Sequence, residues 1–91
     1  MQLTLMGSHY CEDTLAAMQT LAANQVEYEF VDISGQLEGL KRFLNARDGN
    51  PLFAQALGRG IGIPYFRFAD GFETLELERA LEHLGRQRPE V

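Results

Sequence analysis

The sequence has one cysteine, so it cannot close an internal disulfide. A small secreted domain is usually stapled by several disulfides, so this absence argues against that class and for a reducing compartment. The first residues show neither the basic segment nor the apolar run of a signal peptide. No apolar run approaches the roughly 20 residues that span a membrane. We therefore expect a cytoplasmic protein with no membrane partner.

Positive charge is also scarce. Eight Lys and Arg residues stand against 13 Asp and Glu residues, which gives a net charge of −5. Nucleic acids and anionic membranes select clustered Lys and Arg, so we expect neither as a partner. The apolar share of 45% argues against disorder, and the length of 91 residues suits one core. We expect a single domain over residues 1–91 that ends in a flexible polar tail at 87–91.

The first third of the chain has the pattern of a strand, a helix and a second strand. Leu3 to Met6 is a short apolar run that Gly7 ends, and residues 26–31 alternate apolar and polar side chains. Between them, a helix from Glu12 to about Ala23 is predicted by one apolar face, formed by Leu15, Met18, Leu21 and Ala22. Such a βαβ unit places its two strands parallel.

The middle of the chain is helical. A helix over about 36–47 is predicted with an apolar face of Leu37, Leu40, Phe43 and Leu44. Asn50 followed by Pro51 predicts an N-cap and the first position of a further short helix. Its buried face would be Leu52, Phe53, Ala56 and Leu57. The glycine-rich segment 58–62 follows, and it lacks the spacing and the Lys-Ser/Thr pair of a nucleotide loop, which disfavours a phosphate site.

The last third predicts a hairpin and a helix. Pro64 begins an apolar strand over 63–68, and Ala69-Asp70-Gly71 has the signature of a hairpin turn. A return strand over 72–75 and a helix over about 75–85 follow, with Thr74 as the candidate cap. His83, on this helix, is expected at the surface. The whole order is typical of an α/β domain with a four-stranded mixed sheet and helices on both faces.

Cys11 stands where the first predicted strand gives way to the first helix. The unpaired N–H groups and the positive end of the helix dipole favour a thiolate there. The alternative is that Cys11 is a small buried hydrophobe, as many free cysteines are. Glu12 and Asp13 are two anions that work against a thiolate. His9 could offset them when it is protonated, or it could simply face solvent.

These features together resemble the thioredoxin fold, and among its families the glutaredoxins. In that family the reactive cysteine starts the first helix, as Cys11 does, and a cis-proline that faces it opens the third strand, as Pro64 does. Residues 40–48 and 60–64 are similar to bacterial glutaredoxin-related proteins. The resemblance implies a thiol-disulfide oxidoreductase with glutathione as co-substrate. It also implies that the backbone of Ile63 pairs with the cysteinyl part of a bound thiol.

The active-site motif departs from the family. Where glutaredoxins carry C-P-x-C, C-G-F-S or C-x-x-S, this chain carries Cys11-Glu12-Asp13-Thr14. Without a second cysteine only a monothiol cycle is open, in which Cys11 takes glutathione from a mixed disulfide and a second glutathione releases it. Thr14 occupies the resolving position. Its hydroxyl could bond the thiolate or could bond backbone in the first helical turn.

The residues with which the glutaredoxin family binds glutathione are only partly present in this sequence. The family's Gly-Gly pair is absent from residues 71–75, and a lysine before the motif is absent from residues 7–9. Arg59 and Arg42 are the candidates to bind a ligand carboxylate, because guanidinium binds carboxylate with two hydrogen bonds. Tyr10 could flank a bound thiol, or it could pack partly into the core.

Two other functions stay open. The departures favour a non-catalytic thioredoxin-fold module that serves for binding or responds to redox conditions. For either function, the expected partners are glutathione or a small thiol, and protein disulfides. An iron–sulfur carrier would use Cys11 with glutathione thiols across a dimer, although the C-G-F-S motif is absent. Cys11 and His9 are too few ligands for a structural zinc site, which needs four, so no metal site is predicted.

Overall fold

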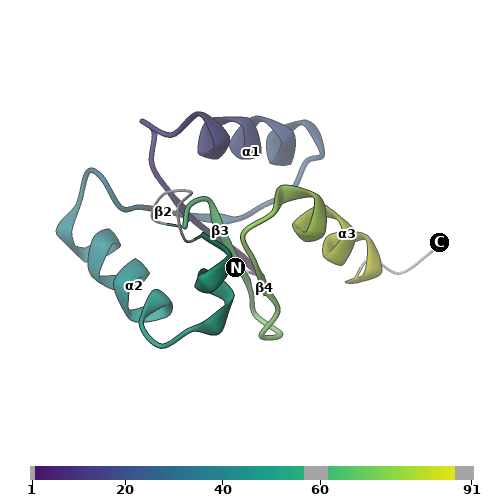
Figure 1. Cartoon of the computed structure of the whole chain (residues 1–91). Coiled ribbons are helices and arrows are strands. Elements are labelled where there is room, and N and C mark those ends of the chain that lie inside the picture. Colours follow the sequence, from purple (N-terminus) through teal and green to yellow (C-terminus); the bar gives the residue numbers. More distant parts are fainter. Residues whose placement is uncertain (1, 57–61, 88–91) are drawn as a thin grey trace.

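The computed structural model describes residues 2–56 and 62–87. Its elements along the chain are β1 (Leu3–Gly7), α1 (Glu12–Ala23), β2 (Glu29–Asp32), α2 (Leu37–Arg47), the 3₁₀ helix η1 (Pro51–Ala56), β3 (Tyr65–Phe68), β4 (Glu73–Thr74) and α3 (Leu77–Gln87). Figure 1 shows their arrangement. The predictions at Leu57, at Arg59 with most of its glycine-rich segment, and over the tail 88–91 lie outside the described residues. None of the described helices is long and apolar enough to cross a bilayer.

The described strands form one mixed sheet in the order β2-β1-β3-β4. β1 and β2 are parallel, with Gly7 beside Asp32 at their carboxyl ends. β3 is antiparallel to β1 and pairs Tyr65 with Met6, and β4 is antiparallel to β3. The predicted four-stranded mixed sheet and the parallel βαβ unit are therefore confirmed for the described part of the chain.

The sheet separates two apolar clusters because successive residues of a strand point to opposite faces. Leu3 and Leu5 point toward α1 and α3 and pack in one cluster, whose other buried members are Ala17, Leu21, Phe66, Phe68 and Ala80. Met6 points toward α2 and η1 in the other cluster, which contains Val31, Ile33, Phe43, Phe53 and Tyr65. Helices thus cover both faces, as predicted, with α1 and α3 on one face and α2 on the other (Figure 1).

The buried face of α1 differs from the prediction. Thr14, Ala17 and Leu21 are buried, whereas Leu15 is exposed. Short side chains at positions 14 and 17 let the helix lie close to the sheet. A Cβ built on Gly7 would lie 2.6 Å from the Thr14 hydroxyl oxygen. The close approach turns the helix by about one residue from the face that apolar spacing alone suggested.

The approach of α2 to the sheet also depends on a small residue. A Cβ on Gly39 would lie 2.0 Å from the backbone oxygen of Asp32, so only glycine permits this contact. Phe43 is buried as predicted, but Leu37 is 66% exposed and Leu44 is also exposed. The predicted apolar face of this helix was therefore too wide.

β2 starts three residues later than predicted because α1 ends in a Schellman-type motif. Gln25 adopts a left-handed conformation with φ of 59°. Its N–H bonds the oxygen of Ala22, and the N–H of Val26 bonds the oxygen of Leu21, both at 3.0 Å. Val26 is thereby used to terminate the helix, and the strand begins only at Glu29.

The start of α3 also differs from the prediction. The helix begins at Leu77, two residues late, and the Glu76 oxygen accepts its first bond, from Ala80 N–H. Thr74 Oγ1 instead accepts from Glu76 N–H at 3.1 Å, which makes a turn before the helix. The hairpin turn is confirmed, with Gly71 at φ of 96°. The short helix at Pro51 is also confirmed, since Asn50 Oδ1 accepts from Leu52 N–H.

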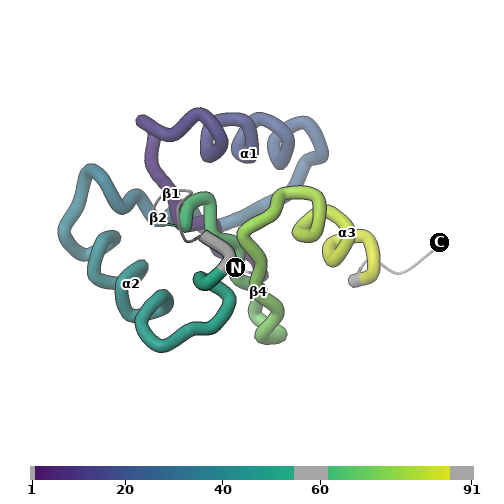
Figure 2. Tube along the Cα trace, in the orientation of Figure 1, coloured from purple at the N-terminus to yellow at the C-terminus, as the bar shows by residue number. Residues whose placement is uncertain are grey.

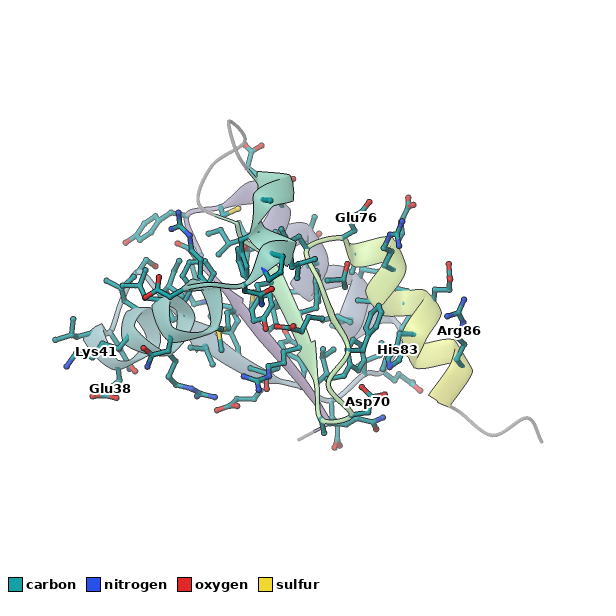
Figure 3. All side chains as sticks on the ribbon, turned by 60° about the horizontal axis from the view of Figure 1, so that its bottom comes forward. Glu38, Lys41, Asp70, Glu76, His83 and Arg86 are labelled. Carbon is teal, nitrogen blue, oxygen red and sulfur yellow. The ribbon has the colours of Figure 1, made fainter. Side chains whose placement is uncertain are left out.

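His83 is half-buried against the hairpin, so the prediction that it lies at the surface was wrong. Its side chain is only 16% exposed. Its ring stacks on Phe72 with a centroid distance of 4.1 Å and meets the edge of Phe68. Its Nε2 lies 2.7 Å from Asp70 Oδ2 in the hairpin turn. Figure 3 shows the two side chains facing each other between that turn and α3, so this contact ties the hairpin to the last helix.

Candidate functional site

Three segments of the chain meet at one edge of the sheet. β1 and β2 both end there, and Tyr65, paired with Met6, starts β3 beside them. The loops that leave β1 and β2 lie together at the left of Figure 2, with α1 starting above and α2 below. We call residues 8–11, 33–35 and 63–64 the thiol edge. It brings Cys11, Ile63 and Pro64 to one side of the molecule.

Cys11 is the N-cap of α1. Its backbone is extended, with φ of −103° and ψ of 120°, and its oxygen accepts the first helical bond from Leu15 N–H at 3.0 Å. The residue is half-buried, so it is not a hydrophobe enclosed in the core. Among the described residues none forms a side-chain capping bond with its sulfur. The Cys11 side chain therefore stands at the positive end of α1 and does not itself cap the helix.

Pro64 is buried and Ile63 is half-buried at the same edge. The peptide bond between them is cis, as the resemblance to glutaredoxins implied. Their position next to β3, beside the end of β1, is the one expected for residues that face a thiol at the start of α1. The closeness of the Cys11 sulfur to Pro64 and the binding role of Ile63 stay predictions.

Thr14 is fully buried beneath the loop that carries Cys11. Its Oγ1 accepts from the backbone N–H of Ser8 at 3.4 Å. The sequence left two partners open for this hydroxyl, the Cys11 thiolate and a backbone group of the first helical turn. The structure shows a backbone partner, but its N–H belongs to the loop before the helix. The catalytic role of Thr14 stays a prediction.

Ser8 is the residue that sequence reasoning missed. It is buried and all of its polar groups are bonded: its oxygen accepts from Cys11 N–H at 3.0 Å, and its N–H donates to Thr14. Its hydroxyl accepts from Tyr10 N–H at 3.1 Å and donates to Ser34 Oγ at 2.9 Å. A serine just after a strand is a common turn residue. That signal existed in the sequence, but the partner on a distant loop did not.

Asp32 anchors the second loop of the thiol edge. Its Oδ1 accepts from both the N–H and the hydroxyl of Ser34, at 2.9 and 2.7 Å. The bond from the Ser34 hydroxyl is the main cause that holds the pKa of Asp32 below its ordinary value of 3.8. The bond from the Ser34 N–H and the charge of His9 add to the effect. The Nδ1 of His9 lies 3.6 Å from Asp32 Oδ2, and its ring meets the edge of Phe30. His9 is therefore within ion-pair distance of Asp32.

Tyr10 is 89% exposed, so the alternative that it packs into the core is wrong. It stands beside Cys11 with its ring available to a ligand, and that role stays a prediction. Glu12 and Asp13 are exposed in the first turn of α1, where the helix dipole favours their negative charge. The surface that follows the thiol is consequently acidic.

Arg42 does not lie at the thiol edge. Its guanidinium forms two hydrogen bonds with Glu29, at 2.9 and 3.2 Å, and these are the main cause that lowers the pKa of Glu29. Glu29 pairs with Thr4 at the start of β2, three residues before its carboxyl end. At about 3.3 Å per strand residue, the pair is anchored about 10 Å from Asp32. Arg59, the other predicted cation, lies outside the described residues.

Residues 2–56 and 62–87 contain no group of three or more His, Cys, Asp and Glu side chains that could hold a metal ion. The described arrangement offers one half-buried thiol at a helix start, an exposed aromatic ring beside it in sequence, and a buried proline at the same edge of the sheet. No known protein-family model matches the sequence, and a search of curated proteins gave no match.

Proposed function

We propose that this protein is a glutaredoxin-like monothiol oxidoreductase with a thioredoxin-like fold. Cys11 would act on glutathione mixed disulfides, with glutathione as the co-substrate and the cytoplasm as the compartment that supplies it. The observation that carries the proposal is the position of Cys11: half-buried, at the N-cap of α1, on the same edge of the sheet as Ile63 and Pro64.

The proposed reaction has two exchange steps. The Cys11 thiolate attacks the glutathione sulfur of a protein–glutathione disulfide, a new S–S bond forms, and the protein leaves as a thiolate. A second glutathione thiolate then attacks the same glutathione sulfur. Glutathione disulfide leaves, and Cys11 returns as a thiolate. No second protein thiol is needed, which fits the single cysteine of the chain.

The architecture supports the fold that this proposal assumes. The order β2-β1-β3-β4, with β1 parallel to β2 and the other neighbours antiparallel, is compatible with a thioredoxin-like domain. The N-terminal position of Cys11 supports the chemistry, since the free N–H groups of the first turn favour a thiolate. Glu12 and Asp13 oppose it, so we expect slow turnover relative to enzymes without these anions.

The test is reduction of a glutathione mixed disulfide by the wild type and by Cys11→Ser. We expect turnover by the wild type and background rate by the variant, with a glutathione adduct on Cys11 seen by mass spectrometry. A wild type that does not exceed background would exclude the enzyme. Tyr10→Ala, which leaves the thiol in place, tests whether the exposed ring contributes to substrate binding.

One observation favours a non-catalytic, thiol-binding module instead. Arg42, a candidate for the ligand carboxylate, is held by Glu29 away from the thiol edge. A module of this kind would form the adduct on Cys11 once and would not release it to glutathione. Adduct formation without turnover in the same assay would select this second function. Absorbance after anaerobic incubation with iron and sulfide tests the iron–sulfur carrier.

A further inference from the structure

We propose that Asp32, Ser34 and Ser8 are positioning residues for Cys11, linked as a hydrogen-bond relay between the loops of the thiol edge. The relay runs from the Asp32 carboxylate through the hydroxyls of Ser34 and Ser8 to the backbone N–H of Tyr10. This inference rests on the proposed thiol chemistry of Cys11. It assigns a role to Ser8 and Ser34, which are 26 positions apart and lie outside the motif Cys11-Glu12-Asp13-Thr14.

The first step is the turn that presents Cys11. The oxygen of Ser8 accepts from Cys11 N–H, and its hydroxyl accepts from Tyr10 N–H. Two consecutive peptide groups of the turn are thus held by one side chain and its own backbone. The N–H of Ser8 is held in turn by the buried hydroxyl of Thr14. The position of the Cys11 backbone therefore depends on where Ser8 sits.

The second step is the direction of the hydroxyl protons. The Ser34 hydroxyl donates to Asp32 at 2.7 Å, so its oxygen lone pairs are left to accept from Ser8 at 2.9 Å. The Ser8 hydroxyl proton is then committed to Ser34, and its own lone pairs face Tyr10 N–H. The Asp32 carboxyl, whose ordinary pKa of 3.8 is lowered further by these bonds, is ionised at neutral pH, and an ionised group accepts the stronger hydrogen bonds. One carboxylate thereby orients two hydroxyls.

A second aspartate in the protein shows what the relay adds. Asp70 makes the same local turn as Asp32, accepting from the N–H two residues ahead at 3.0 Å, and it also faces a histidine. Asp70 lies in the hairpin turn, against α3 (Figure 3). It stabilises its own turn and the contact with His83. Asp32 does the equivalent and also reaches the loop of Cys11 through Ser34, so the two aspartates are a matched pair.

The consequence is a thiol held in one place relative to the start of α1. Attack on a disulfide requires alignment of three sulfur atoms, and a fixed turn supplies part of that alignment in advance. Loss of one hydrogen bond in the relay should slow the attack without abolishing it. The net worth of one such bond corresponds to a rate change of about twofold to tenfold.

The experiment compares Ser34→Ala, Ser34→Thr, Asp32→Asn and Asp70→Asn with the wild type. The readout is the second-order rate at which Cys11 forms an adduct with glutathione disulfide, followed by mass spectrometry, beside the urea midpoint of each variant. We expect Ser34→Ala and Asp32→Asn to slow adduct formation by about twofold to tenfold. Ser34→Thr, which keeps the hydroxyl, should restore the rate, and Asp70→Asn should lower the midpoint without slowing the adduct.

An unchanged rate in Ser34→Ala would overturn the relay, as would an equal slowing in Asp70→Asn, which would indicate general loosening. Ser34 is exposed, so its alanine variant should fold even if Asp32→Asn does not. The adduct forms in a single step, so the relay can hold while the turnover assay fails. A wild type that forms no adduct at all would overturn both proposals.

Discussion

At the residue scale, two partly buried polar clusters stand out, and each includes a hydrogen bond between segments distant in sequence. Tyr65 is fully buried on β3, and its hydroxyl donates to Glu73 on β4, which also accepts from Asn50. Ser8 similarly joins the two loops of the thiol edge. Sequence patterns identified the strands and turns that carry these residues. They could not identify the partners, because hydrogen bonds between side chains are set by three-dimensional placement.

Tyr65→Phe should lower the free energy of unfolding by about 1 kcal/mol at neutral pH, since it removes one buried hydrogen bond. Burial, with the bond to Glu73, raises the pKa of Tyr65. A tyrosine with a raised folded pKa contributes stability below its unfolded pKa of about 10, and this stability is lost as pH rises further. Urea unfolding should therefore show a smaller alkaline loss in the variant. Tyr10→Phe, at an exposed position, is the control and should match the wild type.

Asp32→Asn should lower stability at neutral pH and should flatten the acid side of the stability profile. Because the folded pKa of Asp32 is lowered, its contribution is present above its ordinary value of 3.8 and is lost as pH falls through the folded value. The two proteins should converge in acid when unfolded by urea over a series of pH values. A constant difference at every pH would mean that the carboxylate charge does not contribute.

At the element scale, glycine decides how closely a helix approaches the sheet. Gly39 in α2 faces the backbone oxygen of Asp32, whereas in the described part of the chain a Cβ on Gly85 in α3 would have no neighbour within 4 Å outside its own helix. Apolar periodicity predicted both helices. It did not distinguish the two glycines, since their roles depend on what lies opposite each of them.

Gly39→Ala and Gly85→Ala should change stability in opposite directions. Gly39→Ala places a methyl group against backbone that cannot move away. We therefore expect its free energy of unfolding to fall by about 1–3 kcal/mol, the usual cost of an overpacked core, or by more. The second replaces glycine in an exposed helix position and should gain about 0.5–1 kcal/mol from helix propensity. Urea midpoints of the two variants measure both effects. A tolerated Gly39→Ala would contradict the close approach of α2 to β2.

At the scale of the whole molecule, one sheet divides the interior into two clusters. Phe66 belongs to the cluster under α1 and α3, and Phe43 to the cluster under α2. The strands of the sheet contribute side chains to both clusters, so a loss of packing in one cluster should also disturb the other. We therefore expect the described domain to unfold as one unit.

Phe66→Ala and Phe43→Ala should each cost about 3–5 kcal/mol, as large-to-small changes in a core do. Each variant should still give a single transition, with the same midpoint by far-UV circular dichroism and by tyrosine fluorescence. Should Phe43→Ala melt the α2 side first, the two probes would separate, and the clusters would be independent units.

The sequence by itself determined the order of elements, the parallel βαβ unit, the hairpin turn and the place of Cys11 at the start of α1. These depend on local signals: apolar period, turn residues and a proline at a strand start. Only the tertiary structure decided that Arg42 binds Glu29, that His83 packs half-buried against Phe72 and that Ser8 bonds Ser34. Each of these joins atoms from different elements, and local spacing carries no record of which distant side chain will lie opposite.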